Sequence, residues 1–95
     1  MNLKTKHDAA KAVSAAILFK GQEGTVTTLQ IQKEAELKEH ITKVPALLVC
    51  VTGKIVYEDE SGARETLLSG DFVNIEPMVK HRVNALEDSQ LLVIK

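Results

Sequence analysis

Turn-forming residues divide this chain into short segments in which β-branched residues are abundant. From residue 16 onward, turn signals that contain glycine, serine or proline recur at short intervals. Val, Ile and Thr are frequent between them and fit a pleated sheet better than a helix. The pattern predicts eight or nine strands, over residues 16–20, 25–32, 36–42, 46–52, 55–59, 64–68, 71–75, 81–86 and 90–94. Since no long helix intervenes, the chain is predicted to be all-β, an antiparallel sandwich or barrel.

The 95 residues are expected to form one domain over 1–95, with an N-terminal extension (1–15) and a barrel (16–95). Within the extension, Asp8 is a suitable N-cap for a short helix through Ala9–Val13. His7 lies in the same polar stretch, and we expect it to be exposed and to take no part in a site.

Composition excludes two classes of partner. The net charge is -1, Lys and Arg form no cluster, and the only aromatic residues are two Phe and one Tyr. The chain therefore has neither the basic patch nor the stacking platform of a nucleic-acid binder. The longest apolar run, Pro45–Val51, is far shorter than the ~20 residues that a membrane helix needs. With a single cysteine, Cys50, and no secretory signal, we expect a cytoplasmic protein.

The run Pro45–Val51 is apolar at every position instead of alternating. A strand that is apolar on both faces must be covered on both sides. Because the outer face of a small barrel is normally wet, we expect a second subunit to cover this strand, which makes the protein a homodimer.

Two histidines lie in predicted strands, and period-two alternation predicts different orientations for their side chains. His81 shares a face with the apolar Val83, so it is predicted to point inward. His40 lies on the face opposite Leu37 and Ile41, which directs it to solvent or to a polar cavity.

Residues 25–95 resemble the small single-domain cupins, whose fold is a double-stranded β-helix, a jelly-roll-like barrel. The first cupin motif reads Gly, five residues, His-x-His, three or four residues, Glu, six residues, Gly. His40 matches its first histidine and Gly53 its closing glycine, whereas Thr42 and Ala46 stand at its second histidine and its glutamate.

The second cupin motif reads Gly, five residues, Pro-x-Gly, two residues, His. Gly70-Asp71 matches its start and His81 its histidine, whereas Glu76 stands at the proline and Met78 at the glycine. The resemblance implies a pocket at the barrel mouth that holds His40 and His81 close together. The usual cupin metal site has three histidines and one glutamate, of which only these two histidines are retained.

Our first hypothesis is a barrel that binds a small polar molecule, without catalytic residues that we can assign. His40, Thr42 and His81 supply the polar groups of such a pocket. Counting from the motifs, its wall is predicted to consist of Leu48, Cys50, Ile75 and Met78. Cys50 most simply acts as a small buried hydrophobe, and Met78 as a gap-filler over the mouth.

The alternative hypothesis is a metal-dependent cupin enzyme, an isomerase or an oxygenase, with a depleted ligand set. His40 and His81 are the candidate ligand pair for a divalent Zn, Ni, Fe or Mn ion, and Glu39 or Glu76 the nearest carboxylates. A metal-free variant would use one histidine as general base and one of these glutamates to orient it, as in the cupin-type sugar-nucleotide epimerases.

Overall fold

The computed structural model describes residues 1–95 and contains nine strands and one short 3-10 helix. The elements are η1 (Leu3–Lys6), β1 (Val13–Lys20), β2 (Thr25–Ile31), β3 (Glu36–His40), β4 (Ala46–Thr52), β5 (Lys54–Asp59), β6 (Arg64–Leu68), β7 (Phe72–Ile75), β8 (His81–Ala85) and β9 (Ser89–Ile94). The predicted strands are confirmed, and their ends differ from the observed ones by at most three residues.

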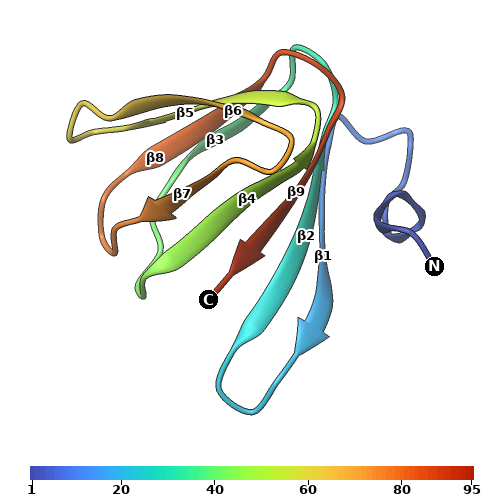
Figure 1. Ribbon diagram of the computed structural model, residues 1–95, viewed down its shortest axis with the longest axis horizontal. Coiled ribbons are helices and arrows are strands. Elements are labelled where there is room, and N and C mark those ends of the chain that lie inside the picture. Colours follow the sequence, from blue (N-terminus) through green and yellow to red (C-terminus); the bar gives the residue numbers. More distant parts are fainter.

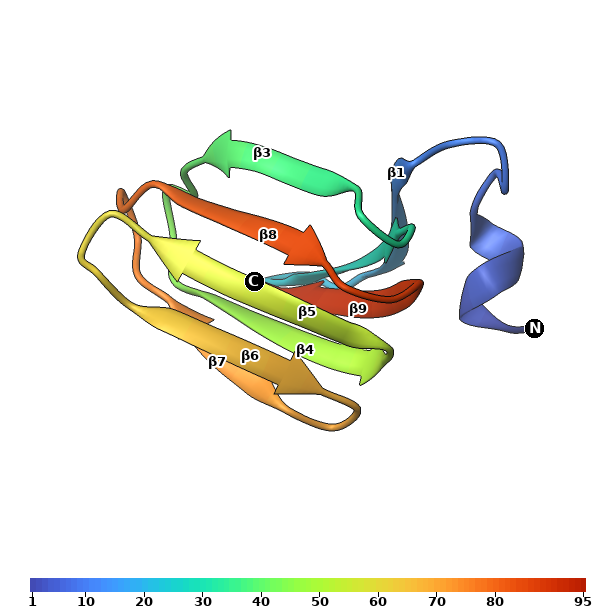
Figure 2. The same ribbon diagram turned by 90° about the horizontal axis from the view of Figure 1, so that it is seen from above.

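The strands form two antiparallel sheets. One sheet has five strands in the order β1-β2-β9-β4-β7, and the other has four in the order β3-β8-β5-β6. The sheets face each other (Figure 2), and the β1–β2 hairpin extends beyond the other strands (Figure 1). Apart from the consecutive pairs β1–β2 and β5–β6, neighbours in each sheet are far apart in sequence, as in the pairing of β9 with both β2 and β4. The fold is therefore a double-stranded β-helix, as predicted.

The core lies between the two sheets. Twelve buried apolar residues form a single cluster, to which every strand except β1 and β3 contributes. They are Leu29, Ile31, Ala46, Leu48, Cys50, Ile55, Tyr57, Leu67, Ile75, Val83, Ala85 and Leu91. In β4 the alternate residues Ala46, Leu48 and Cys50 point into this cluster and are buried. The core thus extends through the middle of both sheets.

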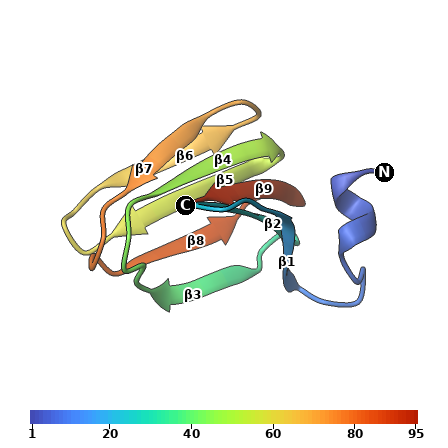
Figure 3. The ribbon, with the colours of Figure 1, turned by 90° about the horizontal axis from the view of Figure 1, so that it is seen from below.

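The N-terminal segment differs from the expectation at three points. The helix predicted over Ala9–Val13 is wrong: the Asp8 carboxylate accepts a hydrogen bond from the Ala10 amide at 2.9 Å and closes a turn, and β1 begins at Val13 instead of residue 16. A run this short cannot offset the cost of nucleating a helix. The segment lies to one side, beyond β1 (Figure 3).

His7 is the third difference, because it is half-buried instead of exposed. Its Nδ1 and Nε2 atoms lie 2.8 Å from the Ser14 hydroxyl and 3.1 Å from the Thr28 hydroxyl, both of which are buried. Burial, and then the charge of Lys6, lower the pKa of His7. His7 therefore fastens the N-terminal segment to the β1–β2 hairpin.

A β-bulge in β3 turns His40 to the face opposite the one that alternation within β3 alone indicates. Leu37 pairs with Val83 and His40 pairs with His81, so three steps along β3 correspond to two steps along β8. The extra residue shifts the alternation by one position. As a result His40 lies opposite His81, on the face that Leu37 occupies, and this face borders the cavity described below.

The outer face of β4 continues into an uncharged apolar surface. Leu47 pairs with Ile94 of β9, and Val49 pairs with Leu92 of β9 and with Phe72 of β7. Phe72 is 62% exposed and Ile94 is 39% exposed, whereas the other three side chains are half-buried. We call these five residues the β4 outer face.

Candidate functional site

One cavity, of about 230 Å³, lies between the inner faces of the two sheets. Seven of its twelve lining residues are hydrophobic, and none is acidic. The lining consists of Ala15, Thr27, Leu29, Leu37, His40, Thr42, Leu48, Ile75, His81, Val83, Val93 and Lys95. The cavity is thus an apolar chamber with a few polar groups, the usual composition of a small-molecule site.

The polar end of this cavity is a pair of histidines from the adjacent strands β3 and β8. The Nε2 atoms of His40 and His81 lie 3.1 Å apart, and their ring centroids are 4.1 Å apart at an interplanar angle of 59°. His81 is 2% exposed, whereas His40 is exposed. The pair therefore joins the buried interior of the cavity to its open side.

Backbone carbonyls fix the tautomer of both rings. Nδ1 of His40 lies 3.0 Å from the Lys38 carbonyl oxygen, and Nδ1 of His81 lies 3.2 Å from the Val79 carbonyl oxygen. Because a carbonyl can only accept, each Nδ1 must carry the proton and donate. In the neutral rings both Nε2 atoms then present a lone pair toward each other. A proton, a hydrogen-bond donor or a cation between them satisfies both nitrogens.

Tyr57 and Asp59 support His81 from the side away from His40. The Tyr57 ring stacks on the His81 ring at 5.9 Å and 29°, and the Tyr57 hydroxyl donates to Asp59 Oδ2 at 3.0 Å. Burial, and then the hydrogen bond to Asp59, raise the pKa of Tyr57, so it stays protonated. Burial is also the largest influence on His81 and lowers its pKa, although the hydrogen bond to the Val79 carbonyl opposes this.

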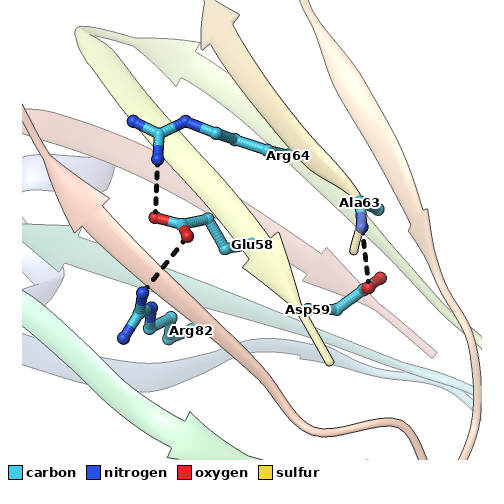
Figure 4. Close-up of polar contacts among 5 residues, drawn as sticks. All are labelled: Glu58, Asp59, Ala63, Arg64 and Arg82. Atoms are coloured by element: carbon cyan, nitrogen blue, oxygen red, sulfur yellow. Dashed lines mark hydrogen bonds and ion pairs between the residues drawn. The ribbon is translucent and has the colours of Figure 1, made fainter. Parts of the chain in front are cut away.

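A second, strongly charged hollow of about 200 Å³ lies next to His81 and is lined by Glu39, Glu58, Asp59, Glu60, Lys80, His81 and Arg82. Two of its carboxylates have partners. Glu58 contacts Arg64 at 3.5 Å and Arg82 at 3.2 Å, and Asp59 accepts from the Ala63 amide at 3.2 Å (Figure 4). His81 is the one residue that borders both hollows.

Five of the seven predicted pocket residues line the cavity, namely His40, Thr42, Leu48, Ile75 and His81. The hydroxyl of Thr42 donates to the Val44 carbonyl, which leaves its lone pairs free to accept from a ligand.

Cys50 and Met78 do not line the cavity, which corrects the predicted wall. Cys50 is fully buried in the core, one period of alternation beyond Leu48. Met78 is 60% exposed and adopts φ 65°, the left-handed conformation that glycine provides in the cupin motif. Its amide donates to the Thr42 carbonyl at 2.8 Å, which holds this loop to the segment before β4, although Met78 does not line the cavity.

The two glutamates considered as partners of the histidines lie elsewhere. Glu39 borders the charged hollow, and Glu76 lines neither hollow. No group of three or more His, Cys, Asp or Glu residues is arranged to hold a metal ion. The pair of Nε2 atoms fits two neighbouring positions of a metal ion, but no third His, Cys, Asp or Glu joins them, so the full cupin metal site does not fit these residues.

The sequence did not identify the remaining seven lining residues. Alternation along β2 and β8 could have found Thr27, Leu29 and Val83, since they share the inner face with core residues or with His81. No local pattern marks Lys95, which joins the cavity only because β9 pairs with β2.

Two facing antiparallel sheets with the strand orders given above form a double-stranded β-helix. No family model matches the sequence, and no curated protein matches it. Solved structures, however, match the fold over nearly the whole chain.

A cupin superfamily protein from Desulfitobacterium hafniense superposes with a TM-score of 0.84 at 12% identity and covers 98% of this chain and 84% of its own. An uncharacterized conserved protein with a double-stranded β-helix domain from Klebsiella pneumoniae superposes with a TM-score of 0.83 at 12% identity, and the match covers 99% of this chain and 85% of that one. An RmlC-like cupin from Shewanella frigidimarina superposes with a TM-score of 0.80 at 20% identity, and the match covers 92% of this chain and 78% of that one. The chain therefore has the same fold as these cupins. No helix in it is long and apolar enough to cross a membrane.

Proposed function

We propose that this cupin barrel binds a small molecule that has one polar group and a compact apolar body. The observation that carries the proposal is the convergence of two imidazole Nε2 atoms, 3.1 Å apart, on one end of an otherwise apolar cavity. The cavity of about 230 Å³ is below the ~300–1,000 Å³ of pockets that hold drug-sized ligands, which favours a small metabolite.

The two ends of the cavity give the ligand a direction. Each Nδ1 atom already donates to a backbone carbonyl, so the Nε2 atoms are the free atoms of the two imidazoles. These Nε2 atoms, with the free lone pairs of the Thr42 hydroxyl, receive the polar group. Leu29, Leu48 and Ile75, all on the inner face of the five-stranded sheet, receive the apolar body. No catalytic carboxylate lines the cavity, which favours binding over proton-transfer catalysis.

The test is a panel of small polar metabolites, screened by amide chemical shifts of the ¹⁵N-labelled protein. We expect ligands to shift the amides of β3, β8 and the inner residues of β4. His40→Ala combined with His81→Ala should abolish those shifts, whereas His7→Ala, which removes an imidazole outside the cavity, should leave them unchanged. Binding that survives the double variant would contradict the proposal.

A metal-dependent activity is the second candidate, and the converging Nε2 lone pairs are the observation that favours it. His40 and His81 would hold a divalent ion, and the bound molecule or water would complete its coordination, since no third His, Cys, Asp or Glu is arranged with them. When bound, such an ion supplies Lewis-acid chemistry.

Metal content separates the two candidates. We expect tag-free wild-type protein to contain well under one Zn, Ni, Fe or Mn per chain, because two imidazoles alone hold a metal weakly. The His40→Ala, His81→Ala double variant provides the baseline for adventitious metal. About one ion per wild-type chain, lost in the double variant, would favour the metal-dependent candidate instead.

We also propose that the protein forms a homodimer in which a second copy covers the β4 outer face. The face carries no charged side chain, and an identical copy offers an equally uncharged apolar surface, so no charge is left unpaired when the two meet. A charged partner surface would lose hydration there without compensation.

We therefore expect Val49→Lys, at the centre of this face, to weaken the dimer by at least about a hundredfold, because it buries an unpaired charge. Sedimentation equilibrium measures the change. Leu86→Lys is the matched control, since Leu86 is 44% exposed and lies outside the β4 outer face. A wild-type protein that sediments as a monomer at micromolar concentration would refute the dimer.

A further inference from the structure

The polar groups around the histidine pair accept hydrogen bonds and do not donate them. Nδ1 of each imidazole donates to a backbone carbonyl, so the Nε2 atoms of His40 and His81 present lone pairs. The Thr42 hydroxyl is in the same state, because its hydrogen is used on the Val44 carbonyl. These acceptors line one cavity, and a bound molecule is the remaining source of hydrogens for them.

The contact between the two Nε2 atoms, at 3.1 Å, needs a hydrogen. Moving a proton from Nδ1 to Nε2 within either ring would set the Nδ1 lone pair against a carbonyl oxygen. Adding a proton between the rings would place a positive charge beside His81, which is 2% exposed, in a cavity that no acidic residue lines. A hydrogen supplied by a bound molecule avoids both costs.

We propose, on the basis of the function proposed above, that the polar group of the ligand is an uncharged, amide-type –NH₂ group. The two Nε2 atoms are close enough for one nitrogen atom to reach both with hydrogen bonds of ordinary length, one hydrogen to each. The compact apolar body of the ligand packs against Leu48 and Ile75. Thr27, the other threonine of the lining, can donate its hydroxyl hydrogen to the carbonyl of an amide.

Other polar groups match the lining less well. A hydroxyl has a single hydrogen and would leave one Nε2 atom unsatisfied, and a carboxylate has none. An ammonium group has enough hydrogens, but its charge would meet no acidic side chain in the lining.

The test compares probes of the same shape with and without the –NH₂ group. The pairs are benzamide with acetophenone and 3-methylbutanamide with 4-methylpentan-2-one, in which a methyl group replaces –NH₂. They are titrated into the full chain, in the presence of a chelator, and followed by amide chemical shifts. Because the ketones leave both Nε2 atoms unpaired, we expect each amide to bind at least about tenfold more tightly than its ketone. Benzamidinium, which has the shape of benzamide and a positive charge, should bind more weakly than benzamide.

Histidine variants assign this preference to its source. His40→Phe keeps an aromatic ring but removes one acceptor, so the amide-to-ketone affinity ratio should fall at least about threefold. The His40→Phe, His81→Phe double variant should bring the ratio close to one. His7→Ala is the matched control, because it removes an imidazole outside the cavity and should leave the ratio at the wild-type value. An amide spectrum of each variant verifies that it is folded.

The imidazole nitrogens test the premise directly, since a ¹⁵N chemical shift distinguishes a protonated ring nitrogen from one with a lone pair. At about pH 8 and without ligand, we expect the Nδ1 atoms of His40 and His81 to be protonated and their Nε2 atoms to be unprotonated. Both Nε2 signals should move when benzamide binds.

The outcomes distinguish this inference from the function on which it rests. Ketones that bind as tightly as the amides would overturn the –NH₂ assignment and leave small-molecule binding intact. Tighter binding of benzamidinium than of benzamide would overturn the uncharged class. A protonated Nε2 atom in the free protein, or a preference that persists in the double variant, would overturn the role of the histidine pair. Failure of all probes, while other metabolites of the panel bind, would overturn the amide class. Failure of probes and panel alike would overturn the proposed function itself.

Discussion

Gly53→Ala is expected to destabilise the fold by about 2–5 kcal/mol, the sum of a backbone and a steric effect. Gly53 joins β4 to β5 with φ 102°, a left-handed conformation that costs alanine about 1–2 kcal/mol. A Cβ at this position would also lie 2.6 Å from the Asp88 carbonyl oxygen and 2.8 Å from Ser89 Cα, and it would overlap the Ser89 hydroxyl. Because these contacts are mostly backbone, the β8–β9 connection would have to move.

Gly70→Ala is the matched control for this substitution. Gly70 has φ 91°, but a Cβ there would meet nothing within 4 Å, so only the backbone cost of about 1–2 kcal/mol should appear. Urea unfolding of the three proteins measures both values. Equal losses in the two variants would show that the strand connection yields easily and that the close approach of Ser89 does not constrain Gly53.

Leu48→Ala is expected to cost about 2–5 kcal/mol, the usual range for a buried leucine. Leu48 is 1% exposed and belongs to both the core cluster and the cavity wall. Its truncation should therefore lower the unfolding midpoint and, in addition, enlarge the cavity. For a domain of this size, with a total stability of about 5–14 kcal/mol, such a loss is a large fraction.

Leu68→Ala provides the comparison, because Leu68 is 50% exposed and should change stability by no more than about 0.5 kcal/mol. Denaturant unfolding measures stability, and titration with ligands from the metabolite panel measures the cavity. We expect ligands with larger apolar bodies to gain affinity in Leu48→Ala relative to smaller ones. A loss no greater than that of Leu68→Ala would mean that Leu48 is not packed as described.

Much of the fold could be predicted because its determinants are local. Turn residues and β-branched segments predicted all nine strands, since both act through the conformations of a few neighbouring residues. The inward position of His81 was predicted too, because β8 alternates without interruption through Val83 and Ala85. The N-terminal helix was wrong because propensity over five residues is too weak to outweigh a closed turn at Asp8.

The site was only partly predictable, because the positions of its parts depend on contacts between distant segments. His40 faces the cavity since a bulge arises where β3 pairs with β8, and alternation within β3 alone directs it to the opposite face. The count from the cupin motifs assigned Cys50 to the wall, yet the core of the barrel encloses it.

The sequence by itself therefore determined which residues form strands, where the turns lie and that His81 points inward, because backbone preferences and period-two alternation are properties of neighbouring residues. Only the tertiary structure decided that His40 faces His81, that Lys95 borders the same cavity and that Met78 does not cover it. Register, bulges and the course of the chain after β9 are set by hydrogen bonds between strands far apart in sequence, and those bonds exist only in the folded barrel.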